Sequence, residues 1–141
     1  DCYLDGDEDA LTAKQKDGLK AFINNACITC HSGVALGGSM MQKFGLFGNY
    51  WEYTKSKKID KGLAEVTGKS SDEYIFKVPS LRNITKTGPY FHDGSVESLE
   101  KSIKIMAKLQ SNKDITEDEV ADIISFLESL EADLDPEMKT L

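Results

Sequence analysis

The sequence contains few metal-binding residues and no long apolar run. Its 141 residues include only three cysteines and two histidines, so a zinc site, which usually takes four such ligands, has few candidates. The longest stretch without a charged residue, 21–42, is interrupted by Asn, Thr, His, Ser and Gly and predicts no membrane-spanning helix. Arginine occurs once, as Arg82, and only its guanidinium can contact a carboxylate through two parallel hydrogen bonds.

The composition is that of an ordinary globular protein with an acidic excess. Hydrophobic residues make up 40%, charged residues 29%, and the net charge is −7. This charge disfavours nucleic acid and anionic membranes as partners and favours a partner with a basic face, although solubility alone also explains it. The length predicts a single domain, 1–141, with a lead-in at 1–9 and a tail at 133–141 that we expect to be poorly ordered.

The most informative stretch is the C-x-x-C-H motif formed by Cys27, Cys30 and His31. Two thiols three positions apart lie about one helical turn from each other, so both can form thioethers along one edge of a porphyrin. The neighbouring His31 can then give iron a nitrogen ligand. The motif therefore predicts one covalently attached haem c, with His31 as the first axial ligand.

Two other interpretations compete with haem. A thioredoxin-like redox pair needs a preceding strand and a βαβ context, whereas residues 12–26 have the pattern of an amphipathic helix. A zinc site would have to recruit Cys2 and His92, since no other cysteine or histidine lies outside the motif. Cys2 is the odd cysteine; we expect a surface residue at a chain end, with a free thiol or an intermolecular partner as the alternatives.

The hydrophobic pattern predicts helices at about 12–26, 98–109 and 116–130, and no convincing pair of strands. The first and last open with capping boxes, Thr12 with Gln15 and Thr116 with Glu119. Between them, the glycine-punctuated stretch 32–77 is expected to wrap the haem. Its aromatic residues, Trp51 among them, either line the haem pocket or pack a small core under the loop. The fold class is therefore all-α, with long loops.

The second axial ligand has several candidates. The second histidine is His92, and the methionines are Met40, Met41, Met106 and Met138. Met138 lies in the tail, Met40 and Met41 lie in the glycine-rich stretch, and Met106 lies on the apolar face of a helix. That face suits a thioether in a haem crevice, but a methionine there can equally be core filler, so periodicity alone leaves the choice open.

Longer segments resemble the bacterial dihaem cytochrome c peroxidases and their MauG-like relatives. The similarity lies in 76–84 (FKVPSLRNI), 87–95 (TGPYFHDGS), the opening 3–12 and the closing helix 123–130. The order of these segments and the placement of the motif match the C-terminal, high-potential haem domain. The resemblance implies a cytochrome c-like single haem domain.

The resemblance also implies roles for individual residues. The methionine 17 positions after Pro89 is Met106, which corresponds to the family's distal haem ligand. His92 corresponds to a histidine near the path between the two haems, and Pro79 belongs to the segment expected to contact haem. The carbonyls of Thr87 and Pro89 correspond to part of a calcium site completed by the other family domain, so here that site would be half built. Arg82 is our own candidate for a haem propionate partner, with an ordinary loop-anchoring ion pair as the alternative.

The expected function is electron transfer through a closed His31/Met106 iron in the bacterial periplasm, where c-type haems reside. The chain begins at Asp1 without a leader, so we expect a mature form or a piece of a longer protein. The alternative is a part or variant of a peroxidase that reduces hydrogen peroxide. Because only one motif is present, we do not expect these residues alone to be an enzyme. The expected partner is a small cytochrome or cupredoxin with a basic face, or else a second haem domain or a homodimer.

Overall fold

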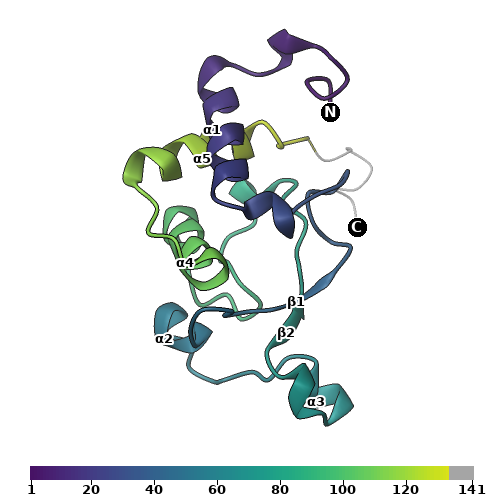
Figure 1. Ribbon diagram of the computed structural model, residues 1–141, viewed down its shortest axis with the longest axis vertical. Helices are drawn as coiled ribbons and strands as arrows, with labels where there is room; N and C mark the ends of the chain where they lie inside the picture. Colours follow the sequence, from purple (N-terminus) through teal and green to yellow (C-terminus); the bar gives the residue numbers. More distant parts are fainter. Residues whose placement is uncertain (134–141) are drawn as a thin grey trace.

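The computed structural model describes residues 1–133 and is dominated by helices (Figure 1). The three principal helices are α1 (Ala13–Asn24), α4 (Leu99–Ser111) and α5 (Glu117–Glu128), close to the three predicted ranges. The shorter helices are α2 (Tyr50–Thr54), α3 (Ala64–Thr67) and the 3-10 turns η1 (Glu8–Ala10), η2 (Cys27–Thr29), η3 (Ser70–Asp72) and η4 (Ile84–Lys86). Within 1–133 no helix is long and apolar enough to cross a membrane. Met138 and the predicted tail from 134 onward lie outside the described residues.

Both predicted capping boxes are present. The Thr12 hydroxyl accepts from the Gln15 backbone N–H at the start of α1, while the Gln15 side chain accepts from the Thr12 backbone. Thr116 and Glu119 repeat the arrangement at the start of α5. Each box satisfies two backbone donors that a helix N-terminus leaves free, so the polar sequence before each apolar stripe sets where the helix begins.

Helices α1 and α5 cross in close contact near the top of Figure 1. The crossing is possible because position 18 is glycine: a Cβ there would lie 1.9 Å from the Asp122 carbonyl oxygen. Beside it, the rings of Phe22 and Phe126 pack with their centroids 5.4 Å apart. This contact fixes the direction in which α1 leads into the C-x-x-C-H motif.

One short sheet corrects the expectation that no strands pair. Strands β1 (Met41–Lys43) and β2 (Ile75–Lys77) are antiparallel, with Gln42 opposite Phe76. Three residues per strand are too few to show a period of two in the sequence, and the pairing joins positions more than thirty residues apart. The pair closes the base of the long loop that contains α2 and α3.

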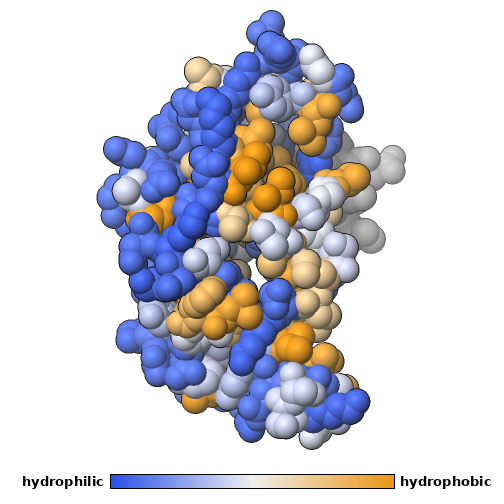
Figure 2. Space-filling model, in the orientation of Figure 1, coloured by the Kyte–Doolittle hydropathy of each residue, from blue (hydrophilic) through white to orange (hydrophobic). Residues whose placement is uncertain are grey.

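The apolar residues form two separate clusters. The first lies between α1 and α5 and is built on Phe22, Ile123, Phe126, Leu127 and Leu130. The second, the aromatic cluster, lies between α4 and the long loop and is built on Phe44, Tyr50, Val96, Ile105 and Leu109. Figure 2 shows the molecule hollowed between its upper and lower parts, with apolar residues around the hollow. Two clusters separated by an apolar-lined hollow are the arrangement expected of a core completed by a flat apolar cofactor.

Candidate functional site

The C-x-x-C-H motif follows directly from the end of α1. The helix stops at Asn24, Asn25 caps it, and Ala26 adopts a left-handed backbone conformation with φ of 63°. This turn redirects the chain into η2, where the backbone N–H of Cys30 and of His31 both donate to the Cys27 carbonyl. The two thiols and the imidazole therefore sit on one short, hydrogen-bonded turn, as the spacing predicts.

The state of the two cysteines separates the competing interpretations. Cys27 and Cys30 are half-buried and are not joined in a disulfide. Burial against the α1/α5 cluster raises the pKa of the Cys27 thiol to about 11. The reactive cysteine of a thioredoxin-like pair has a lowered thiol pKa, and residues 1–133 contain no group of three or more Cys, His, Asp or Glu side chains able to hold a metal. The half-buried pair, with Cys27 beside an apolar cluster, fits thioether attachment to an apolar ring.

His31 is held in the tautomer that a metal ligand needs. Its Nδ1 lies 3.3 Å from the Leu36 carbonyl oxygen, which can only accept, so Nδ1 carries the proton and Nε2 keeps its lone pair. Burial lowers the pKa of this imidazole, although the carbonyls of Leu36 and Pro79 oppose the change. The protein environment therefore favours a neutral, oriented ring.

Gly37 brings a second backbone segment against His31. A Cβ at position 37 would lie 2.1 Å from the Pro79 carbonyl oxygen and 3.2 Å from His31 Nδ1. The backbone φ of 123° is also one that L-residues rarely adopt. The loop after the motif therefore packs against the segment at Pro79, whose ring is exposed and whose carbonyl faces the imidazole side.

The remaining haem candidates lie on the aromatic cluster. Met106 projects from α4 and is half-buried against this cluster. Trp51 packs edge-on to Tyr50, with centroids 5.2 Å apart. His92 is exposed but stacks on Phe76 at 4.2 Å. The structure thus places Cys27 on one apolar cluster and Met106 on the other.

Arg82 anchors a loop. Its Nε and one terminal nitrogen donate to the Val34 carbonyl at 3.0 and 2.7 Å, and the same terminal nitrogen pairs with the Asp1 carboxylate at 2.6 Å. These contacts tie the segment after the motif to the segment 79–83. A propionate contact of Arg82 stays a prediction.

The two calcium candidates and Cys2 lie at the surface. Thr87 and Pro89 are exposed, and the Thr87 hydroxyl donates to the Ile84 carbonyl. Their carbonyls as calcium ligands stay a prediction. Cys2 is exposed and not in a disulfide, which agrees with a surface residue at a chain end.

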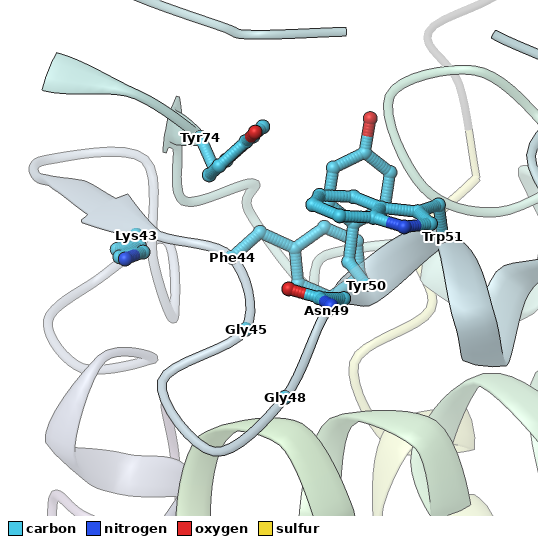
Figure 3. Close-up of a pocket in the computed structure, with 8 residues that line it drawn as sticks. All are labelled: Lys43, Phe44, Gly45, Gly48, Asn49, Tyr50, Trp51 and Tyr74. Atoms are coloured by element: carbon cyan, nitrogen blue, oxygen red, sulfur yellow. The ribbon is translucent and has the colours of Figure 1, made fainter. Parts of the chain in front are cut away.

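A small cavity lies beside the aromatic cluster, away from the motif (Figure 3). It has a volume of about 150 Å³ and is lined by Lys43, Phe44, Gly45, Gly48, Asn49, Tyr50, Trp51 and Tyr74. Pockets that bury small ligands occupy roughly 300–1,000 Å³. It includes neither cysteine nor His31, so it is not where a haem would be held.

The side chains present fit a haem. The two thiols are available, the imidazole tautomer is fixed by Leu36, and apolar surfaces are offered by both clusters. Sequence reasoning missed two contributors, Gly37 and Asn25. The adjacent glycines at 37 and 38 were the available signal for a close backbone approach, whereas nothing in the sequence distinguished Asn25 from its neighbour Asn24.

Comparison with known proteins places the chain in a family. The cytochrome c family model matches residues 15–131. The chain is 41% identical, over 94% of its length, to the cytochrome c551 peroxidase of Nitrosomonas europaea, and 44% identical, over 92%, to that of Pseudomonas aeruginosa. It spans only 39% and 37% of those two proteins.

More distant relatives extend the same grouping. The methylamine utilization protein MauG of Methylophilus methylotrophus is 29% identical over 93% of the chain, which spans 41% of that protein. A crystal structure of a MauG-like protein associated with microbial copper homeostasis superposes with a TM-score of 0.68 at 26% identity, covering 86% of this chain and 44% of the other. The chain belongs to the cytochrome c family, as a haem domain like those of the cytochrome c peroxidases and MauG proteins.

Proposed function

We propose that this chain is a periplasmic monohaem electron-transfer protein that resembles the electron-entry domain of the dihaem cytochrome c peroxidases, with iron held between His31 and Met106. Haem c attached through Cys27 and Cys30 would supply an iron that alternates between Fe(II) and Fe(III). The observation that carries the proposal is the oriented, neutral His31 on one apolar cluster with the Met106 thioether on the other.

The chain's own residues have three tasks in this function. The Leu36 carbonyl holds the His31 ring, so the nitrogen ligand does not rotate when the charge on iron changes. The aromatic cluster packs against the half-buried Met106, and apolar surroundings on this side would favour the less charged reduced state of a bound haem iron. Tight packing on both sides keeps the rearrangement that accompanies electron transfer small.

The test is the ferric spectrum of the haem-loaded chain. A weak sulfur-to-iron band that persists in peroxide and cyanide is expected, and a high-spin ferric spectrum at neutral pH would overturn the proposal. Met106→Ala should abolish the band, lower the reduction potential and open the iron to cyanide. Met40→Ala and Met41→Ala serve as matched controls, because both methionines are exposed. Loss of the band in either control instead would assign the ligand there.

A peroxidase role is the second candidate, and the names of the relatives favour it. In this version the domain accepts electrons from a small cytochrome or cupredoxin and passes them to a second haem domain, where hydrogen peroxide is reduced. Sequencing upstream of the codon for Asp1 tests it: an open frame with a further C-x-x-C-H motif is expected. Rapid peroxide turnover by residues 1–141 alone would instead place the reaction in this domain.

A further inference from the structure

The buried residue Asn25 joins three parts of the molecule directly before the haem-attachment turn. It is 5% exposed, one of the few buried polar side chains among residues 1–133. Its Nδ2 donates to the Ala21 carbonyl at 3.0 Å, at the end of α1, and to Glu119 Oε1 at 3.2 Å, at the start of α5. The backbone carbonyl of Asn25, rather than its side chain, accepts from the Ser111 hydroxyl at 3.1 Å, at the end of α4.

The two carboxylate oxygens of Glu119 accept hydrogen bonds from different residues. Oε2 accepts from the backbone N–H and the hydroxyl of Thr116, which completes the capping box of α5, while Oε1 accepts from Asn25. In the other capping box, in α1, the carboxamide oxygen of Gln15 accepts from Thr12 and has no further donor among residues 1–133. The α5 cap therefore does more than start a helix, because it also holds the residue two positions before Cys27.

The hydrogen bond from Ser111 connects Asn25 to the helix that carries Met106, the candidate second iron ligand. Ser111 is the last residue of α4, the helix that carries Met106. A second contact reinforces it, since the Lys113 ammonium donates to the carbonyl of Asn24. The segment that leads to Cys27 and His31 is thus hydrogen-bonded to the end of the helix that carries Met106. Each of these two bonds joins a side chain, that of Ser111 or Lys113, to a backbone carbonyl just before Cys27.

We propose that Asn25 is a positioning residue that fixes the haem-attachment turn relative to α4, with Glu119 holding its side chain in place. The inference rests on the proposed function, because it gives Met106 the role of iron ligand. Its consequence is that the separation between the His31 and Met106 ligands is set by this polar joint. Weakening the joint allows the thioether to leave iron more often, although neither ligand has been changed.

The experiment compares four variants of the haem-loaded chain. Asn25→Ala removes both side-chain bonds, and Glu119→Ala removes the partner of Asn25 together with the α5 cap. Glu119→Gln keeps one acceptor oxygen, enough for the α5 cap as in Gln15 of α1, and puts an NH2 group, which only donates, where Oε1 accepts from Asn25. Gln15→Ala is the matched control, because it breaks a capping box that does not touch Asn25.

Two readouts are measured on each variant. The first is the rate at which cyanide replaces the sulfur ligand of the ferric haem. We expect a rise of about tenfold in Asn25→Ala and Glu119→Ala, the size that the loss of a charge-assisted hydrogen bond would give. Glu119→Gln should follow them, because its bond to Asn25 is lost, whereas Gln15→Ala should stay within about twofold of the unsubstituted chain. The second is hydrogen exchange at the amides of Cys30 and His31, which should quicken in the variants at positions 25 and 119 but not in Gln15→Ala.

The outcomes separate the possible failures. If all variants lose thermal stability while cyanide rates and amide exchange at Cys30 and His31 match those of Gln15→Ala, Asn25 is merely structural and the inference is wrong. If the unsubstituted chain lacks the sulfur-to-iron band, the proposed ligation fails, and amide exchange alone still decides whether the joint holds the turn. Should Asn25→Ala fail to fold, the contrast between Glu119→Gln, which loses the bond to Asn25 but keeps an acceptor for the α5 cap, and Gln15→Ala carries the decision.

Discussion

Backbone atoms hold the imidazole of His31 in the orientation and tautomer that the proposed iron ligand needs. The Leu36 carbonyl fixes the tautomer, and the close approach of Gly37 to Pro79 brings the second carbonyl to the same side of the ring. Neither contact depends on a charged side chain, so the ring is oriented without a nearby carboxylate that would raise the electron density at iron. The orientation of the ring therefore depends on the backbone conformation of these two segments.

Gly37→Ala should damage this arrangement. The new Cβ would meet the Pro79 carbonyl at 2.1 Å, in a backbone conformation that alanine rarely adopts. We expect the free energy of unfolding to fall by about 3 kcal/mol or more, from overpacking and backbone strain together. The measurement is denaturant unfolding, together with the position of the haem absorption band.

Gly38→Ala is the control for Gly37→Ala. It has a positive φ of 82° but nothing within 4 Å of its Cβ position. It therefore carries strain alone, about 1–2 kcal/mol, and should leave the haem spectrum unchanged. Equal losses in the two variants would show that the contact with Pro79 does not matter.

The helices and the loops differ in how far the sequence specifies them. Capping boxes and apolar stripes predict α1, α4 and α5 because those signals are local. The strands β1 and β2 were missed because each is only three residues long. At the site, the C-x-x-C-H spacing in the sequence is enough to identify Cys27, Cys30 and His31 as candidates for haem attachment. The partners of His31 and Asn25 are not, because they depend on which distant backbone atoms arrive beside them.

Because Glu119 completes the α5 cap, we expect the free energy of unfolding to fall as the pH becomes acidic. The backbone N–H of Thr116, followed by the Asn25 side chain, lowers the pKa of Glu119 from its ordinary value of 4.5. A carboxyl whose pKa is lower in the folded state stabilises the fold above its unfolded pKa. That contribution is lost as the pH falls below about 4.5 and through the lowered value.

The measurement is unfolding of the unsubstituted chain and Glu119→Gln from pH 7 to pH 2. We expect the unsubstituted chain to be the more stable at neutral pH and the difference to vanish in acid. Glu128→Gln, at an exposed glutamate of the same helix, should show a smaller difference at every pH. A Glu119→Gln difference that is constant with pH would contradict the assignment.

The charge of the whole molecule is unevenly distributed. Residues 1–111 contain fifteen basic and fourteen acidic residues, whereas residues 112–133, which include α5, contain eight acidic residues and one lysine. Glu117, Asp118 and Glu128 are exposed on this helix, beside a groove that is also lined by Glu100 and Ile124. The excess negative charge thus lies mainly in the segment that includes α5, where Lys104, Lys108 and Lys86 pair with Glu117, Asp114 and Glu131, and a basic redox partner would be steered toward the remaining acidic residues.

Charge reversal on α5 should slow the approach of such a partner. In the variant Asp118→Lys with Glu128→Lys, the bimolecular rate of reduction by a small basic cytochrome c should fall about tenfold at low ionic strength. The difference should shrink toward nothing near 1 M salt, where the screening length is about 3 Å. Stopped-flow absorbance of the haem-loaded chain measures both.

The matched control reverses charges outside the acidic segment 112–133. Lys57→Glu with Lys58→Glu reverses two exposed charges on the long loop and changes the total charge by the same amount in the other direction. If the acidic segment is the docking surface, this variant leaves the rate nearly unchanged, because the loop does not meet the partner. If only net charge matters, the rate rises as much as the α5 variant lowers it. Only the first result locates the partner on α5, because an effect of net charge alone would change the rate by equal amounts in opposite directions in the two variants.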